Sequence, residues 1–375
     1  MKIEKIKDIE FFDREREIKE IMQILESEPR VINFIYGPIN SGKTTLIQKL
    51  IDDLSGNDSV FYINLRGRLI KEYEEFVRVL FSVKKESALD VLKGFIKKIF
   101  GIGTIPVKYF TGVPVEKWVI DDFFKSKTPG DVFEFLENYF KEISKKGRVI
   151  LIIDELQVIG DLKIDGKLIY KLFNFFIRLT KELHICHVFA VSSDSLFIET
   201  VYSEAMLQGR TKCILIDDFD YETSRKFLEK YNFNRKEIEF VLENIGGKPS
   251  FLREIIDAKI NKPVDVSVKE LLKLEKSKIK EVIRFVRNYG DKVEISDKQY
   301  GIVYEKVVYE DVVETLSKFI EKDKEYVDNI KDIPKRYLVN KNILFFDPVE
   351  DIVKPQSKVD LIAIREILDE MKKRE

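Results

Sequence analysis

Residues 37–44 combine two glycines, a lysine and a threonine in the pattern G-x-x-x-x-G-K-[S/T]. The backbone N–H groups of such a loop point inward at the N-terminus of a helix, where the helix dipole favours an anion. Lys43 would reach the β- and γ-phosphates of a nucleoside triphosphate, and the Thr44 hydroxyl would bind Mg²⁺. The loop residues that we expect to contact the nucleotide are Gly37, Pro38, Asn40, Ser41, Gly42, Lys43, Thr44 and Thr45.

A second group of candidate residues follows the apolar run at 149–153. Apolar strands that end in an acid pair, here Asp154 and Glu155, are typical of the metal-binding strand of nucleotide hydrolases. The strand end would place Asp154 beside Mg²⁺, and Glu155 would orient and polarise the attacking water. Buried strands often end in Asp, so this assignment depends on the phosphate loop upstream.

Three further segments are weaker candidates. One serine of residues 192–194, with Ser193 as our candidate, could sit near the γ-phosphate, although an ordinary turn or helix cap also fits. Arg210 could stabilise charge that develops during phosphoryl transfer, from the same or a neighbouring subunit, or it could be a surface arginine. Residues 246–249 (Gly-Gly-Lys-Pro) could shape the wall around the base or be plain loop punctuation.

The elements around these residues alternate between strand and helix. Apolar runs predict five buried strands, at 31–36, 59–65, 149–153, 187–191 and 212–216. Helical patterns between them lie at about 43–54, 70–83, 131–145 and 167–183. Such alternation favours parallel pairing with helical crossovers. We therefore predict an α/β fold with a parallel five-stranded sheet flanked by helices.

The rest of the chain is predicted to form an insertion and two more regions. Residues 86–130 are interpreted as an insertion with an apolar helix at 91–100 and a short hairpin. Helices fill 221–258, and the C-terminal part ends in a strand-turn-strand at 337–346 and a final helix from Lys358. The predicted domains are a nucleotide-binding core at 1–218, a small helical lid at 219–262 and a C-terminal domain at 263–375.

Composition limits the classes of function. The 375 residues are 44% hydrophobic and 35% charged, which supports sizeable cores under a charged surface. The formal net charge of -1 means that a nucleic-acid surface must be a local patch. Cys186 and Cys213 lie in apolar runs and are expected to act as small hydrophobic residues. No run of the sequence reaches the ~18 apolar residues of a membrane span, so we expect a cytoplasmic protein without membrane contact.

In combination these motifs resemble the archaeal ATPase family, a branch of P-loop proteins related to the AAA+ and STAND classes. The resemblance covers nearly the whole chain, and the insertion at 86–130 matches least. The segments that carry it are 12–17, 36–46, 154–157, 209–210, 246–249 and 337–344.

The resemblance implies that the nucleotide is ATP, exchanged for ADP, and that the C-terminal domain is a winged helix. It places Arg14 near the adenine, where Pro249 of the turn at 246–249 could also lie, and makes Arg210 similar to an AAA+ arginine finger. One departure is Ser250, which stands where many AAA+ relatives have an arginine. Arg253, one helical turn on, is a possible substitute.

Two kinds of partner remain open for the C-terminal domain. A winged helix usually places a helix in the major groove, and Lys335, Arg336 and Lys341 could form a basic patch for double-stranded DNA. However, residues 262–375 contain 24 Lys and Arg against 24 Asp and Glu, whereas DNA-binding domains are more often basic. The alternative is a homo-oligomer or a protein partner whose assembly depends on nucleotide state.

Overall fold

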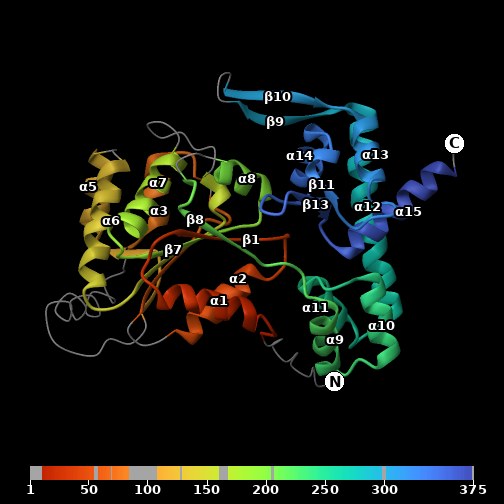
Figure 1. Ribbon diagram of the computed structural model, residues 1–375, viewed down its shortest axis with the longest axis horizontal. Coiled ribbons are helices and arrows are strands. Elements are labelled where there is room, and N and C mark those ends of the chain that lie inside the picture. The colour runs from red at the N-terminus through yellow and green to blue at the C-terminus, as the bar shows by residue number, and fades with distance from the viewer. Residues whose placement is uncertain are drawn as a thin grey trace.

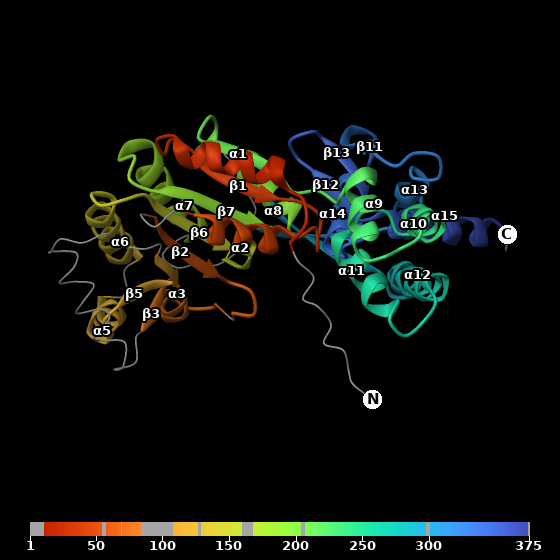
Figure 2. The ribbon, with the colours of Figure 1, turned by 90° about the horizontal axis from the view of Figure 1, so that it is seen from below.

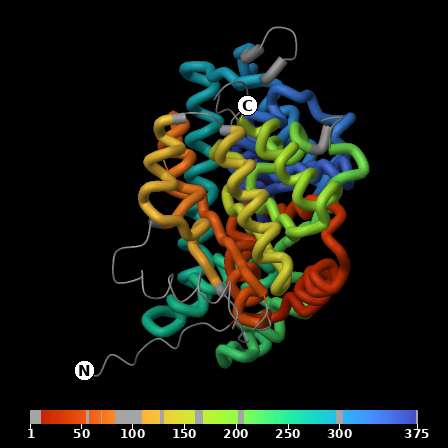
Figure 3. Tube along the Cα trace, turned by 90° about the vertical axis from the view of Figure 1, so that its left-hand side faces the viewer, coloured from red at the N-terminus to blue at the C-terminus, as the bar shows by residue number. Residues whose placement is uncertain are grey.

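The computed structural model describes residues 11–54, 58–68, 70–83, 108–126, 129–159, 168–203, 207–297 and 301–373. The predicted helix at 91–100 lies outside these residues. In Figure 1 the sheet and its helices form the left of the molecule, residues 221–258 the lower right and the C-terminal region the upper right, and Figure 3 shows the sheet region in front of the C-terminal region. Within these ranges no helix is both long enough and apolar enough to cross a membrane.

The core contains a parallel sheet of six strands in the order β4-β2-β6-β7-β1-β8. Figure 2 shows β2, β6, β7 and β1 side by side. The strand bounds are β1 (Ile32–Tyr36), β2 (Ser59–Asn64), β4 (Lys108–Thr111), β6 (Val149–Asp154), β7 (His187–Ser192) and β8 (Thr211–Leu215). The α/β prediction is confirmed, but the count of five strands is wrong.

The sixth strand, β4, comes from the predicted insertion and pairs with β2 at the sheet edge. An edge strand needs only one neighbour, so four residues in a segment rich in Gly and Pro suffice. The described strands of the predicted insertion do not pair with each other as a hairpin, because β4 pairs with β2 and β5 (Val113–Val115) pairs in parallel with β3 (Phe81–Val83). A hairpin at 86–107 would lie outside the described residues and stays a prediction. Helix α3 (Tyr73–Leu80) accordingly stops before residue 83.

Successive residues of each strand point to opposite faces of the sheet, and each face has its own core. Phe34 and Phe61 belong to one cluster with Phe173, whereas Ile35 and Val60 belong to the other. Helices α3, α6 and α7 lie above the sheet in Figure 1, and α1 and α2 lie below it. Their bounds are α1 (Glu15–Glu26), α2 (Lys43–Asp53), α6 (Pro129–Ser144) and α7 (Leu168–Ile177).

Shorter elements complete the core. Helix α7 continues into a π-helical turn, Arg178–Glu182, so the predicted helix at 167–183 changes its hydrogen-bonding pattern partway. The remaining bounds are α5 (Lys117–Ser126), α8 (Ser195–Ser203) and a 3₁₀ turn at Leu156–Ile159.

The lid is helical, as predicted. Its helices α9 (Tyr221–Lys230), α10 (Arg235–Asn244) and α11 (Pro249–Ala258) share a core that includes Phe227 and Leu252. The long helix α12 (Val264–Tyr289) joins two clusters, because Val268 packs in the lid core and Ile283 in the C-terminal core. Figure 1 shows α12 running between the two regions. The division into three domains stays a prediction.

The C-terminal region combines helices with two small antiparallel sheets. Strands β9 and β10 form a hairpin that projects from the molecule (Figure 1), and β11, β13 and β12 form the second sheet. The bounds are β9 (Asp291–Asp297), β10 (Gly301–Val307), α13 (Tyr309–Ser317), β11 (Glu325–Tyr326), a 3₁₀ turn (Val327–Asn329), α14 (Asp332–Asn340), β12 (Leu344–Asp347), β13 (Ile352–Pro355) and α15 (Lys358–Lys372).

The predicted strand at residues 337–339 is wrong, because these residues belong to α14. Strand β12 pairs instead with β13, which follows it in the chain. Three consecutive apolar residues fit a strand and a buried helix equally well, so the pattern alone could not separate them. The final helix from Lys358 is confirmed.

Candidate functional site

The phosphate loop connects β1 to α2 at the carboxyl end of the sheet. Gly37 has φ 153°, and a Cβ there would lie 2.1 Å from the carbonyl oxygen of Ile216. Only glycine therefore allows the loop to pass this close to the strand end of β8. Helix α2 begins at Lys43, so the loop meets a helix N-terminus with its unpaired N–H groups. This is the anion-binding arrangement that the motif predicts.

The Lys43 side chain lies inside the loop and is only 7% exposed. Its ammonium donates to the carbonyls of Gly37 at 3.0 Å and Pro38 at 2.8 Å. Burial, and next the nearby charge of Lys248, lower the pKa of Lys43 to about 8. A phosphate at this position would therefore supply the anion that favours the charged form of Lys43.

Asp154 lies at the end of β6, next to the start of α2. Its Oδ2 accepts hydrogen bonds from the Thr44 hydroxyl at 3.1 Å and from the Tyr62 hydroxyl at 2.7 Å. Burial raises the pKa of Asp154. The hydroxyl of Thr44 and the carboxylate of Asp154 are thus side by side, as the predicted magnesium site requires.

The residues present fit a magnesium ion that is bound together with phosphates. Such an ion takes one or two protein oxygens and completes its shell with phosphate and water. Within the described ranges no group of three or more His, Cys, Asp and Glu side chains is arranged to hold a metal on its own. The Thr44 hydroxyl and the buried Asp154 carboxylate together suit a metal ion that binds as a complex with the nucleotide.

Glu155 is held by two residues that the sequence analysis did not identify. Its carboxylate accepts from the Arg66 guanidinium, with Nε at 3.1 Å, and from Gln157 Nε2 at 2.6 Å. Ser192 in turn donates its hydroxyl hydrogen to Gln157 Oε1 at 2.8 Å. The predicted catalytic carboxylate is therefore tied to a guanidinium on one side and to an amide on the other.

A cavity of about 330 Å³ opens beside the loop. Its far end is aromatic: the rings of Phe12 and Phe227 lie 5.1 Å apart, and the Arg14 guanidinium lies 4.7 Å from the centre of the Phe219 ring. Aromatic faces and a stacked guanidinium suit a planar base. The residues that line the cavity are Phe11, Phe12, Arg14, Asn40, Ser41, Gly42, Lys43, Thr44, Thr45, Arg66, Glu155, Ser193, Phe219, Phe227, Pro249, Ser250 and Arg253.

Most of the predicted site residues meet at this cavity. Gly37, Pro38 and Asp154 do not line it, but they contact Lys43 or Thr44 directly. Arg14 also reaches the loop, where it donates to the Ser41 carbonyl at 2.9 Å.

Arg210 is the exception, because it does not lie at the cavity. It immediately precedes β8, whose first residue pairs with Ile32 at the amino end of β1. The phosphate loop leaves the opposite end of β1. A part for Arg210 in catalysis therefore stays a prediction, and it requires the nucleotide of another subunit.

The sequence contained a signal for some of the missed residues. Arg66 follows the end of β2, and the carboxyl ends of parallel strands meet at one edge of the sheet, so a polar residue there could have been proposed. Phe11, Phe219 and Phe227 had no such signal. They come from three segments that meet only in the folded chain.

The fold and the loop define a P-loop nucleotide-binding protein. A solved structure, the Walker-type ATPase paby2304 of Pyrococcus abyssi, has the same fold with a TM-score of 0.60, at 17% identity over 95% of this chain and 96% of that one. The family described as an ATPase domain predominantly from Archaea matches residues 11–255, and the C-terminal domain of MJ1010-like ATP-binding proteins matches residues 265–368.

The chain belongs to this archaeal ATPase family, which confirms the resemblance found in the sequence. The uncharacterized ATP-binding protein MJ1659 of Methanocaldococcus jannaschii is 45% identical over 98% of this chain and 99% of its own length. The uncharacterized ATP-binding protein PYRAB09480 of Pyrococcus abyssi is 41% identical over 96% of this chain and 99% of its own length.

Proposed function

We propose that this protein binds ATP with Mg²⁺, hydrolyses it, and uses the nucleotide state to control the contacts of its C-terminal region. The observation that carries the proposal is the convergence of Lys43, Thr44 and Glu155 at one cavity with an aromatic end, with Asp154 hydrogen-bonded to Thr44 beside it. The ATP-binding relatives and the family support the choice of nucleotide.

The side chains divide the work of hydrolysis. Lys43 and the loop N–H groups bind the phosphates, and Thr44 and Asp154 would hold Mg²⁺, which would neutralise phosphate charge during the reaction. Glu155 positions a water whose oxygen bonds to the γ-phosphorus while the bond to the β–γ bridging oxygen breaks, giving ADP and phosphate. The proton of that water goes to the Glu155 carboxylate. Glu155 must first exchange its contact with Arg66 or Gln157 for the water.

Contacts of the C-terminal region favour a protein-packing output over a DNA-binding one. The Lys335 ammonium lies 3.1 Å from Glu199 of α8 in the core, and the Arg336 guanidinium also lies 3.1 Å from Glu199. Lys341 pairs with Asp291 at 3.3 Å. The predicted basic patch is thus neutralised by carboxylates, and part of it packs on the nucleotide-binding core.

Duplex DNA is the second candidate partner. The first candidate is protein packing, which would appear as a change in oligomeric state. The two differ in their salt dependence, since DNA binding through phosphates weakens steeply as salt rises. ATP-dependent change in oligomer size without DNA binding supports the protein-packing output.

A steady-state ATPase assay of the purified protein, with and without duplex DNA, tests the proposal. We expect phosphate release that needs Mg²⁺ and stops when the metal is chelated. Turnover unaffected by chelation, or no turnover above a buffer blank in any condition, would contradict it. Stimulation by DNA that is lost at high salt would move the second candidate to first place.

A further inference from the structure

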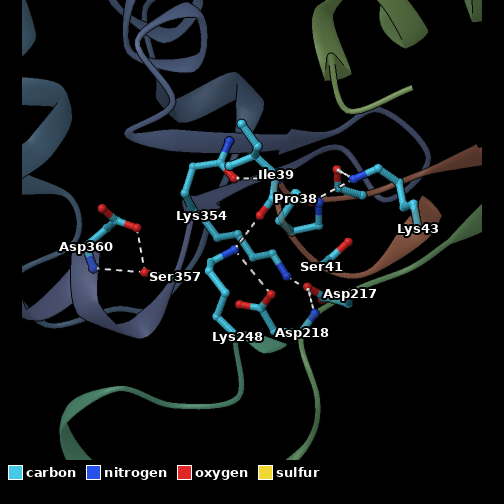
Figure 4. Close-up of polar contacts among 12 residues, drawn as sticks. Pro38, Ile39, Ser41, Lys43, Asp217, Asp218, Lys248, Lys354, Ser357 and Asp360 are labelled. Atoms are coloured by element: carbon cyan, nitrogen blue, oxygen red, sulfur yellow. Dashed lines mark hydrogen bonds and ion pairs between the residues drawn. The ribbon is translucent and has the colours of Figure 1, made fainter. Parts of the chain in front are cut away.

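The phosphate loop contains one residue, Ile39, whose backbone N–H and carbonyl both bond to side chains from outside the loop. The N–H of Ile39 donates to Gln356 Oε1 at 3.2 Å, and the carbonyl of Ile39 accepts from Lys248 Nζ at 2.9 Å. Lys248 immediately precedes the lid helix α11, and Gln356 lies between β13 and α15. Figure 4 shows Lys248 reaching Ile39 across the junction of the loop and the lid.

Lys248 is buried where the phosphate loop meets the lid, and it is not a surface lysine. Its side chain is 2% exposed, and its ammonium pairs with Asp218 Oδ1 at 3.3 Å in addition to the Ile39 carbonyl. The turn before it needs glycine, because a Cβ on Gly247 would lie 1.8 Å from the Phe219 carbonyl oxygen. A buried ammonium costs free energy unless its bonds are satisfied, so these two partners define where Lys248 can sit.

Gln356 is oriented just as firmly from the C-terminal side. It is 4% exposed, and its Nε2 donates to the Leu344 carbonyl at 3.0 Å, which leaves Oε1 to face Ile39. An ion pair joins Lys354 of β13 to Asp217, which lies between β8 and the first lid helix α9 (Figure 4). Loop, lid and C-terminal region therefore meet at one buried polar junction.

The loop needs support at this point. Asn40, which follows Ile39, has φ 61°, a left-handed conformation that is uncommon for residues other than glycine. Such a conformation persists where the surrounding structure holds it. The Ser41 N–H donates to the Pro38 carbonyl at 3.3 Å, so the N–H groups expected to face the phosphates are those of Gly42 and of the first turn of α2. A displaced Ile39 backbone would turn these donors away.

We infer that Lys248 and Gln356 are positioning residues for the phosphate loop, so that nucleotide affinity depends on the lid and the C-terminal region being docked at Ile39. This inference rests on the proposed function of the loop. Because coupling between two equilibria is reciprocal, bound nucleotide must stabilise the docked C-terminal region by the same factor. Lys248 and Gln356 thus supply a physical link between nucleotide state and the C-terminal contacts.

Two variants of the full-length protein test this link. Gln356→Met removes the acceptor of the Ile39 N–H, and Lys248→Met combined with Asp218→Asn removes the donor to its carbonyl without leaving an unpaired buried carboxylate. We expect each to weaken binding of a fluorescent ATP analogue about tenfold, the usual loss for a charge-assisted or buried hydrogen bond. ADP affinity should fall by the same factor, since the loop supports all the phosphates.

Glu199→Gln is the matched control, because it removes a carboxylate that pairs with Lys335 and Arg336 away from the loop and leaves the contacts of Lys248 and Gln356 that hold Ile39 intact. It should leave both affinities within twofold of the wild type. Unchanged affinity in Gln356→Met and in the lysine double variant would overturn the inference while the proposed function stands. A loss confined to ATP would also overturn it, because Lys248 would then contact the γ-phosphate directly.

A nucleotide-free measurement separates this inference from the proposed function. Hydrogen exchange over residues 37–43 should be slow in the wild type and in Glu199→Gln, and faster in Gln356→Met and in the lysine double variant. Thermal melting identifies any variant that is globally unfolded. Equal exchange in all four folded proteins would contradict the role of Ile39 even if ATP binds normally. A wild type that protects this segment but binds no nucleotide would contradict the proposed function, and the affinity claim with it.

Discussion

Two short segments of this chain, the phosphate loop and α14, carry basic side chains that the sequence alone presents as candidate phosphate ligands. In the fold these side chains have different hydrogen-bond partners. In the phosphate loop, the Lys43 ammonium donates to two backbone carbonyls and lies at the edge of a cavity. In α14, Lys335 and Arg336 meet the carboxylates of Glu199 and Asp332. A cation bonded to carbonyls alone gains when an anion arrives, whereas a cation already paired with carboxylates does not.

The partner of a cation, more than its place in a motif, therefore decides whether it can bind phosphate. A lysine whose position is set by backbone geometry can be predicted from a motif. An arginine on a helix has a partner that only the folded chain reveals.

The largest expected effect on nucleotide affinity comes from removing the loop cation. Lys43→Ala should lower ATP affinity at least about a hundredfold, because a buried charge-assisted contact to the phosphates is lost. Equilibrium binding of a fluorescent ATP analogue measures this. The matched control is Lys49→Ala on the same helix α2, whose ammonium pairs with Asp53 and should leave affinity unchanged. Equal affinity in Lys43→Ala and the wild type would overturn the site.

Glu155→Gln should separate binding from turnover. We expect the rate of ATP hydrolysis to fall by about 10²- to 10⁴-fold, the range typical for loss of a general base, while ATP affinity stays within about threefold. Single-turnover phosphate release measures the rate, and the fluorescent analogue measures the affinity.

The control for Glu155→Gln is a second Glu→Gln change that also removes a carboxylate paired with an arginine. Glu137→Gln loses a glutamate that pairs with Arg178 on the core surface, far from the cavity residues. Its turnover should match the wild type. If both variants lost turnover equally, loss of an ion pair and not loss of the base would be the cause.

Much of the fold and the loop was predictable because long apolar runs and a fixed motif carry the information locally. Strands β1, β2, β6, β7 and β8 come from such runs. Strand β4 was missed because four residues amid glycine and proline give too little periodicity. Residues 337–339 were misassigned because a buried helix and a strand share the same apolar signature.

The site shows the same limit. Lys43, Thr44 and Asp154 follow from spacing, since the loop and the strand end fix their positions. Lys248 and Gln356 do not, because their roles arise where separate elements meet, 209 and 317 residues after Ile39. No local pattern records a hydrogen bond over such a distance.

A third, smaller effect concerns pH. Burial lowers the pKa of Lys43 to about 8 in the free protein, and bound phosphate favours its charged form. ATP affinity should therefore be constant below pH 8 and fall by up to about tenfold per pH unit above it, as Lys43 must take up a proton to bind. Titrations of the fluorescent analogue between pH 7 and 9.5 measure this. Constant affinity to pH 9.5 would show that Lys43 keeps its proton in the free loop.

The smallest effect is expected in α14. Arg336→Gln should leave ATP affinity unchanged and lower the melting temperature by only a few degrees, because partly exposed ion pairs contribute at most about 1 kcal/mol. It should also leave any retention of duplex DNA unchanged between 50 and 200 mM salt. A phosphate-binding arginine would instead reduce the slope of log affinity against log salt by about one.

The exposed Arg284 on α12 provides the control, since Arg284→Gln removes the same charge from another face. If Arg336→Gln reduced the salt slope and Arg284→Gln did not, Arg336 would exchange Glu199 for DNA phosphate when DNA is present. The ion pairs between Arg336 and Glu199 would then break when DNA binds. Arg336 and Lys43 would both be able to bind phosphate, and would differ only in the partner that each has in the free protein. Equal slopes in both variants and in the wild type would leave Arg336 as a contact between the C-terminal region and the core.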